Sequence, residues 1–162
     1  MNSNIVRDLA AIVLIFVIFF GGLYLIDTQK AMTDVFGVTP GVVEGKTPTA
    51  DQYRQDFFMW SQVVLGVSLI LTLMWYGLGE WGLRAHRMGD GSKLLIWVVL
   101  LVIELTIVVV AVLSGPPADF NAHVPVLIYL ADGVLSFWLA TVLFSPLDWK
   151  YVPPPAKLLR RW

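Results

Sequence analysis

The chain contains no cysteine among its 162 residues. That absence excludes disulfide bonds, cysteine nucleophiles, iron–sulfur clusters and zinc–thiolate sites. Histidine is also scarce, since His86 and His123 are the only two in the chain. The topology derived below places them on opposite sides of a membrane, so they cannot ligate one haem together. No Ser–His or paired-His arrangement falls within an apolar segment. We therefore expect no enzyme activity, no metal site and no cofactor.

Charge is scarce too. Charged residues make up 14% of the chain, hydrophobic residues make up 57%, and the mean hydropathy is +0.74. A soluble domain carries about 25% charged residues. Four segments, 9–26, 57–79, 94–114 and 124–145, contain no Lys, Arg or His and only two acidic residues, Glu104 and Asp132. Each is close to the roughly 20 residues that cross a hydrocarbon core of about 30 Å. The sequence therefore predicts an all-α integral membrane protein, a single domain of four transmembrane helices.

The distribution of Lys and Arg predicts the orientation. Segments 1–8, 80–93 and 146–162 hold eight basic residues, whereas 27–56 and 115–123 hold three. Lys and Arg concentrate in short cytoplasmic loops, so both termini are expected in the cytoplasm. No A-x-A cleavage site follows the first segment, which we expect to remain as an anchor. A bacterial inner membrane is the expected location.

The connecting segments give further expectations. About 30 external residues, 27–56, separate the first two helices, and a linker of that length is usually functional or disordered. This external segment could be a surface that contacts a partner protein, or it could be a flexible loop. The first helix is expected to extend to Phe36, with Gly37 as its stop. Thr49 or Asp51 is expected to cap the second helix, Ser92 the third, and Asn121 the fourth ahead of Pro125.

The segment 146–162 is a proline-rich, basic tail on the cytoplasmic side. Three consecutive prolines form a stiff spacer, and the residues after them mix basic and apolar side chains that suit an anionic headgroup layer. A partner protein that reads the prolines is the alternative interpretation. The residues concerned are Pro153, Pro154, Pro155, Lys157, Arg160 and Arg161.

The two membrane acids are the most informative feature of the sequence. Glu104 is the central residue of 94–114, and Asp132 lies about 4 Å from the middle of its own span at 1.5 Å per residue. A lone charge there costs several kcal/mol, so such acids are functional-site candidates. Three states would relieve the cost. Both acids could be neutral and hydrogen-bonded to each other, Thr72, Thr106 or Ser136; they could bind a proton or cation; or they could face another protein's helix.

Small residues in the last span indicate where helices approach closely. Ser136 and Ala140 form a small-xxx-small step, and Gly133 lies beside Asp132. We expect these three residues to pack against neighbouring helices.

Two functions are consistent with these features. The first is a non-catalytic subunit of a larger inner-membrane complex, of a secretion, conjugation or energy-transducing type. The midplane acids and the tail would contact other membrane protein subunits and anionic lipid, with no nucleic-acid partner. The alternative is a small oligomeric transporter or channel that uses Glu104 and Asp132 to carry a proton or a cation.

Overall fold

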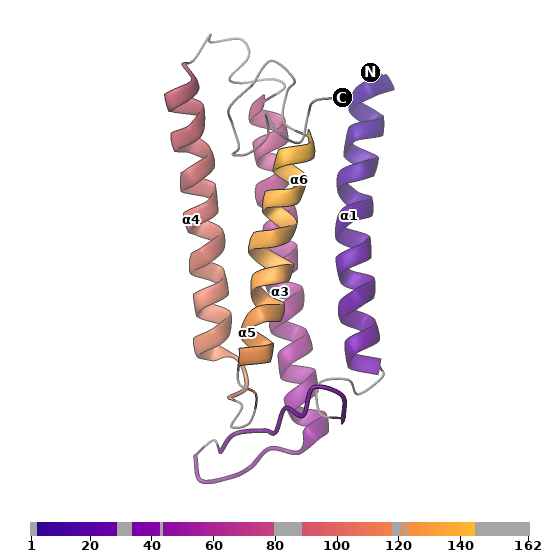
Figure 1. Cartoon of the computed structure of the whole chain (residues 1–162), viewed down its shortest axis with the longest axis vertical. Helices are drawn as coiled ribbons and strands as arrows, with labels where there is room; N and C mark the ends of the chain where they lie inside the picture. Colours follow the sequence, from indigo (N-terminus) through magenta and orange to yellow (C-terminus); the bar gives the residue numbers. More distant parts are fainter. Residues whose placement is uncertain are drawn as a thin grey trace.

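The computed structural model describes residues 3–28, 34–42, 44–79, 89–117, 121 and 123–144. These residues form a bundle of long helices without a β-strand among them (Figure 1). The helices are α1 (Ser3–Thr28), α3 (Ala50–Gly77) and α4 (Asp90–Ser114), followed by α5 (His123–Leu130), the π-helical turn η2 (Ala131–Leu135) and α6 (Ser136–Phe144). Four helical spans are long and apolar enough to cross a membrane: Ile5–Ile26, Ala50–Gly77, Gly91–Ser114 and His123–Phe144. The expected four-helix membrane architecture is therefore present.

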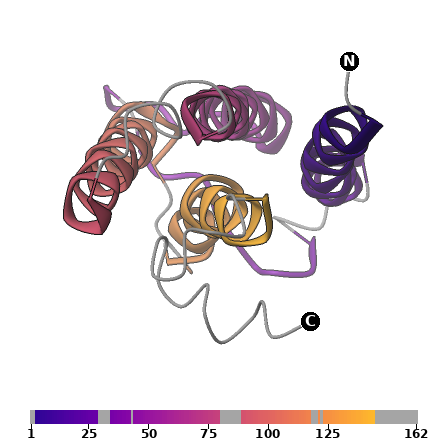
Figure 2. The ribbon, with the colours of Figure 1, turned by 90° about the horizontal axis from the view of Figure 1, so that it is seen from above.

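Successive spans run antiparallel, so the bundle has two distinct ends (Figure 1). The loop end carries residues 34–42 and 44–49, together with the end of α4 and the start of α5. The terminal end carries the start of α1, the end of α3, the start of α4 and the end of α6. Seen along the bundle, α3 and the α5–η2–α6 span occupy the middle, and α1 and α4 flank them on opposite sides (Figure 2).

Helices α1, α3 and α4 begin several residues before the apolar segments do, and their first turns include polar residues. Helix α3 starts at Ala50, where the Thr49 hydroxyl accepts a hydrogen bond from the backbone N–H of Gln52. The Gln52 side chain accepts one from the backbone N–H of Thr49 in return, which completes a capping box. The expected cap at Thr49 is confirmed.

Two other expected caps are wrong. Helix α4 begins at Asp90 with Gly89 in the cap position, so Ser92 is a first-turn residue whose N–H bonds the Gly89 carbonyl. Asn121 does not cap α5 with its side chain. Its Nδ2 donates instead to the Phe36 carbonyl at 2.7 Å, which is a contact between loops that local sequence does not reveal. Pro125 does lie in the first turn of α5.

The described part of the first loop lies against the bundle. Val38 is 1% exposed and packs with Leu23, Tyr53 and Tyr129 in the apolar cluster at the loop end. The Gly41 N–H donates to the Pro117 carbonyl at 2.7 Å. These residues thus form an ordered cover over the loop end. Gly37 has a positive φ of 63°, which suits the expected stop, but residues 29–33 of the expected helical extension lie outside the described part of the chain.

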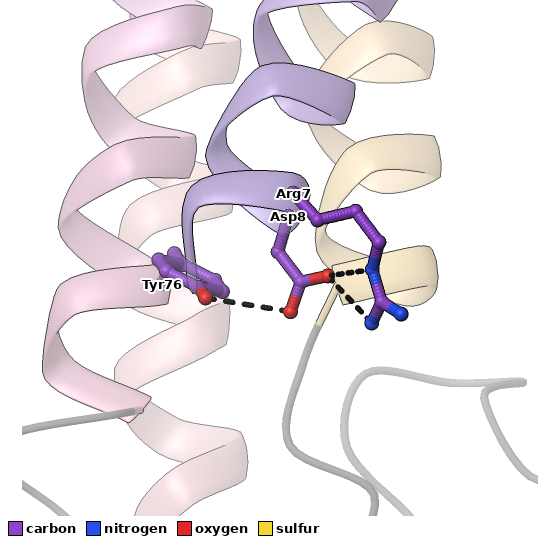
Figure 3. A network of polar contacts seen from close by, with 3 residues as sticks. All are labelled: Arg7, Asp8 and Tyr76. Carbon is purple, nitrogen blue, oxygen red and sulfur yellow. Dashed lines mark hydrogen bonds and ion pairs between the residues drawn. The ribbon is translucent and has the colours of Figure 1, made fainter. Parts of the chain in front are cut away.

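A polar contact joins α1 to α3 at the terminal end (Figure 3). The Tyr76 hydroxyl donates to Oδ2 of Asp8 at 3.4 Å, and Asp8 also pairs with Arg7 at 3.1 Å. Deeper in the bundle, Ile12 and Phe16 of α1 pack in one cluster with Leu65 and Ala140. Helix α1 is therefore fastened to the central pair by a polar contact at its start and by apolar packing along its length.

Candidate functional site

The candidate site lies where α4 meets the π-helical turn. Glu104 of α4 is 0% exposed, and Asp132 of η2 is 4% exposed. A Cβ atom built on Gly133 would lie 2.6 Å from Glu104 Oε1, so the Glu104 carboxyl rests against the residue next to Asp132. Both acids are therefore buried, and they lie on neighbouring helical spans at a similar depth, as the sequence predicts.

The absence of a side chain at Gly133 makes this arrangement possible. Besides Glu104, the added Cβ would lie 2.9 Å from Cγ2 of Val108 and 2.9 Å from Cγ1 of Val64. Three helices thus converge on one glycine. A larger residue would displace the Glu104 carboxyl or separate α3 from the turn.

The π-helical turn places Asp132 and leaves backbone carbonyls that need partners. Such turns are short interruptions of α-helices and are frequent at functional sites. The Ser136 hydroxyl donates to the carbonyls of Asp132 and Gly133. Ser68 of α3 donates to the Gly133 carbonyl at 3.1 Å, and its hydroxyl lies 2.8 Å from that of Ser136. The two serines therefore hold the turn against α3.

The remaining small residue is Ala140, which is 0% exposed and packs against Ile12 and Leu65. Gly133, Ser136 and Ala140 thus all lie at helix contacts in the structure. The tail residues Pro153, Pro154, Pro155, Lys157, Arg160 and Arg161 lie outside the described part of the chain.

No hydrogen-bond partner reaches the Glu104 carboxyl within the described residues, where Oε1 and Oε2 are both buried and unpaired. Oδ2 of Asp132 is in the same condition. The hydroxyls that the sequence suggests as internal hydrogen-bond partners do not pair with the two acids. Ser136 binds backbone carbonyls, Thr106 donates to the Val102 carbonyl at 2.8 Å on its own helix, and the Thr72 hydroxyl is buried and unpaired.

A set of buried hydroxyls lies on the loop-end side of the acids, and sequence reasoning missed it. Ser61 of α3 lies next to the Asp132 carboxyl, although its hydroxyl makes no hydrogen bond of standard geometry in the described structure. Tyr129 precedes Asp132 by three residues, so it lies on the same helix face, one turn closer to the loop end. Its hydroxyl and that of Tyr53 are buried and unpaired there. The spacing of Tyr129 from Asp132 is the signal that could have identified it.

Asp132 also borders a groove on the surface of the bundle. The groove measures about 350 Å³ and lies between α1 and the α5–η2 segment. Among the described residues that line it, Asp132 alone is ionisable, and the others are apolar side chains and one glycine: Ile18, Phe19, Gly22, Leu23, Ile26, Leu127, Ile128 and Ala131. Glu104 does not line it. Of the two acids, only Asp132 therefore lies beside an opening between helices.

Comparison with known proteins adds no assignment to this geometry. No protein-family model, no curated protein and no solved structure matches the chain. Function is therefore inferred from the site itself.

Proposed function

We propose that this protein binds and transfers protons within the membrane, with Glu104 and Asp132 as the proton-binding groups. The observation that carries the proposal is the Glu104 carboxyl, fully buried at mid-span with both oxygens unpaired among the described residues. An ionised carboxyl alone in a membrane costs several kcal/mol. No Lys, Arg or His falls within 57–79, 94–114 or 124–145 to neutralise it. A bound proton removes the charge without requiring any other partner.

A proton suits the site better than a metal cation. Calcium takes six to eight oxygen ligands, and magnesium requires six in octahedral geometry. Within the described part of the chain, no group of three or more His, Asp or Glu residues could hold a metal ion. Two carboxyls with a few hydroxyls form a poor cage for such an ion, but each carboxyl can take up and release a proton.

The positions of the buried hydroxyls suggest which end of the bundle exchanges protons with the acids. Tyr53, Tyr129 and Ser61 lie between the acids and the loop end, and each can both donate and accept a hydrogen bond. Toward the terminal end the hydroxyls of Ser68 and Ser136 are already paired with each other, which leaves the Thr72 hydroxyl as the single buried and unpaired one on that side among the described residues. Beyond them lies an apolar cluster that includes Trp75, Trp97 and Phe137. In this arrangement the acids exchange protons more readily with the loop end.

Proton flux into liposomes tests the proposal. The purified chain is reconstituted, a pH gradient and a counter-ion potential are imposed, and an internal pH-sensitive dye reports the flux. We expect flux above that of empty liposomes, abolished in Glu104→Gln and in Asp132→Asn. Thr106→Val is the matched control, because Thr106 is exposed at a similar depth on α4 and bonds only its own helix. Equal flux through Glu104→Gln and the wild type would refute the proposal.

A second candidate is a non-catalytic subunit of a larger inner-membrane complex, and the loop end favours it. Val35, Phe36 and Val42 are 72%, 40% and 59% exposed on a loop held by backbone and side-chain hydrogen bonds. Exposed apolar side chains on an ordered surface suit contact with another subunit. Replacing Val35 and Val42 by Ser should then release a stoichiometric partner during purification. Proton transfer and membership of an energy-transducing complex are compatible.

We further propose that both termini face the cytoplasm, with the basic tail at the anionic lipid surface of a bacterial inner membrane. The Lys and Arg distribution supports this orientation. A reporter fused after Trp162 should be active only in the cytoplasm. Activity of that fusion outside the cell would show that the orientation is the opposite one.

A further inference from the structure

The exposed face of α3 carries a polar residue at the depth of the buried acids. Gln62 is exposed on the surface of the bundle. It lies two residues from Val64, whose side chain lies against the position of Gly133. Two residues rise about 3 Å along a helix, so the Gln62 amide is level with the acids, within the hydrocarbon core.

An amide in that position needs a partner. The hydrocarbon core offers no water to satisfy its donors and acceptor. Thr106, which is also exposed, satisfies its hydroxyl with a carbonyl of its own helix. Gln62 has no hydrogen-bond partner among the described residues.

The residues around Gln62 on the surface of α3 suit packing against another helix. Exposed residues follow α3 at steps of three and four, the spacing of a helix–helix seam: Met59, Val63, Gly66, Ile70 and Met74. A Cβ atom on Gly66, one turn from Gln62, would meet no atom within 4 Å. Gly66 therefore packs against no other helix among the described residues, whereas a glycine at a membrane helix surface lets a second backbone approach closely. A groove of about 410 Å³ between α1 and α3 includes both residues.

We propose that this face of α3 is the interface with a second copy of the same chain, with the Gln62 amides paired across a two-fold axis. An amide both donates and accepts, so two copies of Gln62 satisfy each other. A two-fold interface brings the same patch of each copy together. On the described spans, Glu104, Asp132, Ser61 and Ser68 at this depth are buried inside the bundle, and the exposed Thr106 hydroxyl is already bonded to its own helix. Gln62 of the second copy is therefore the polar group that is available to pair with Gln62 of the first. The interface does not depend on proton binding by the acids.

Single cysteines test the interface directly, because the natural chain has none. Val63→Cys and Ile70→Cys are introduced in the full chain, reconstituted at high lipid excess and oxidised. Val102→Cys and Val109→Cys are the matched controls, since these residues are 54% and 53% exposed on α4. We expect disulfide-linked dimers from the α3 positions at severalfold the yield from the α4 positions. A disulfide requires Cα atoms within about 7 Å, so the yield reports close approach of the helices.

The dimer fraction, measured by energy transfer between labelled copies, gives a second readout. Gln62→Leu should weaken association about three- to tenfold, the range expected for one membrane hydrogen bond. Gly66→Ile should weaken it at least tenfold, while the open space around Gly66 leaves the thermal unfolding of the single chain unchanged. Equal cross-linking at α3 and α4 would overturn the proposal, as would cross-links from Val63→Cys only to a different protein. Association unchanged in both Gln62→Leu and Gly66→Ile would overturn it as well.

Discussion

Glu104 and Gly133 come from different helices, yet a Cβ atom on Gly133 would lie 2.6 Å from Oε1 of Glu104. This contact places the carboxyl of α4 against the turn that carries Asp132. It also accounts for a glycine within a membrane helix, where Gly would otherwise weaken the structure.

Gly133→Ala should therefore destabilise the bundle. The added methyl group meets Glu104, Val108 and Val64 at once, and overpacking of this kind typically costs about 1–3 kcal/mol. Unfolding in mixed micelles with increasing denaturing detergent measures the loss. Gly66→Ala is the matched control, because its methyl group meets no atom. Equal stability of the two variants would show that Gly133 does not set the contact.

Ser68→Ala should loosen the π-helical turn. The substitution removes a hydrogen bond to the Gly133 carbonyl and the contact with Ser136. Hydrogen bonds within membrane bundles average about 0.6 kcal/mol and reach about 1.7, so we expect a loss in that range. Amide hydrogen exchange at 131–136 should also speed up relative to the rest of α6. Exchange unaltered there would mean that Ser136 alone holds the turn.

Thr49→Ala should destabilise the start of α3. It removes the side-chain half of the capping box, and loss of such a cap typically costs about 1 kcal/mol. Thr47→Ala lies two residues earlier, outside the helix and its cap, and serves as the control. Thermal unfolding followed by circular dichroism distinguishes the two variants. A similar melting shift in both would argue against the cap as the cause.

The number and approximate limits of the membrane helices follow from the sequence, because apolar runs of about 20 residues with almost no charge are typical of membrane spans. The similar depth of Glu104 and Asp132 follows as well, from their positions near the middle of consecutive spans. The inward direction of Glu104 does not. It depends on which face of α4 meets Gly133, and α4 is so uniformly apolar that its sequence does not distinguish one face from another.

The loop contacts and the π-helical turn could not be predicted from the sequence. Asn is a residue type that commonly caps helices, but the side-chain amide of Asn121 donates to the carbonyl of Phe36, 85 residues away in the sequence. The turn at Asp132 depends on Ser68, which lies on another helix. Such long-range partners override local propensity, and nothing near them in the chain indicates them.

Proton binding by Glu104 and Asp132 can be observed directly by infrared spectroscopy. Spectra of the reconstituted protein as a function of pH report the C=O stretch of protonated carboxyls, and an acid without a hydrogen bond absorbs at higher frequency than one in water. We expect such a high-frequency band at neutral pH, lost in part in Glu104→Gln and lost completely in Glu104→Gln with Asp132→Asn. It should decrease reversibly as the pH is raised. A wild-type spectrum without this band, or a band that persists in the double variant, would contradict proton binding by the two acids.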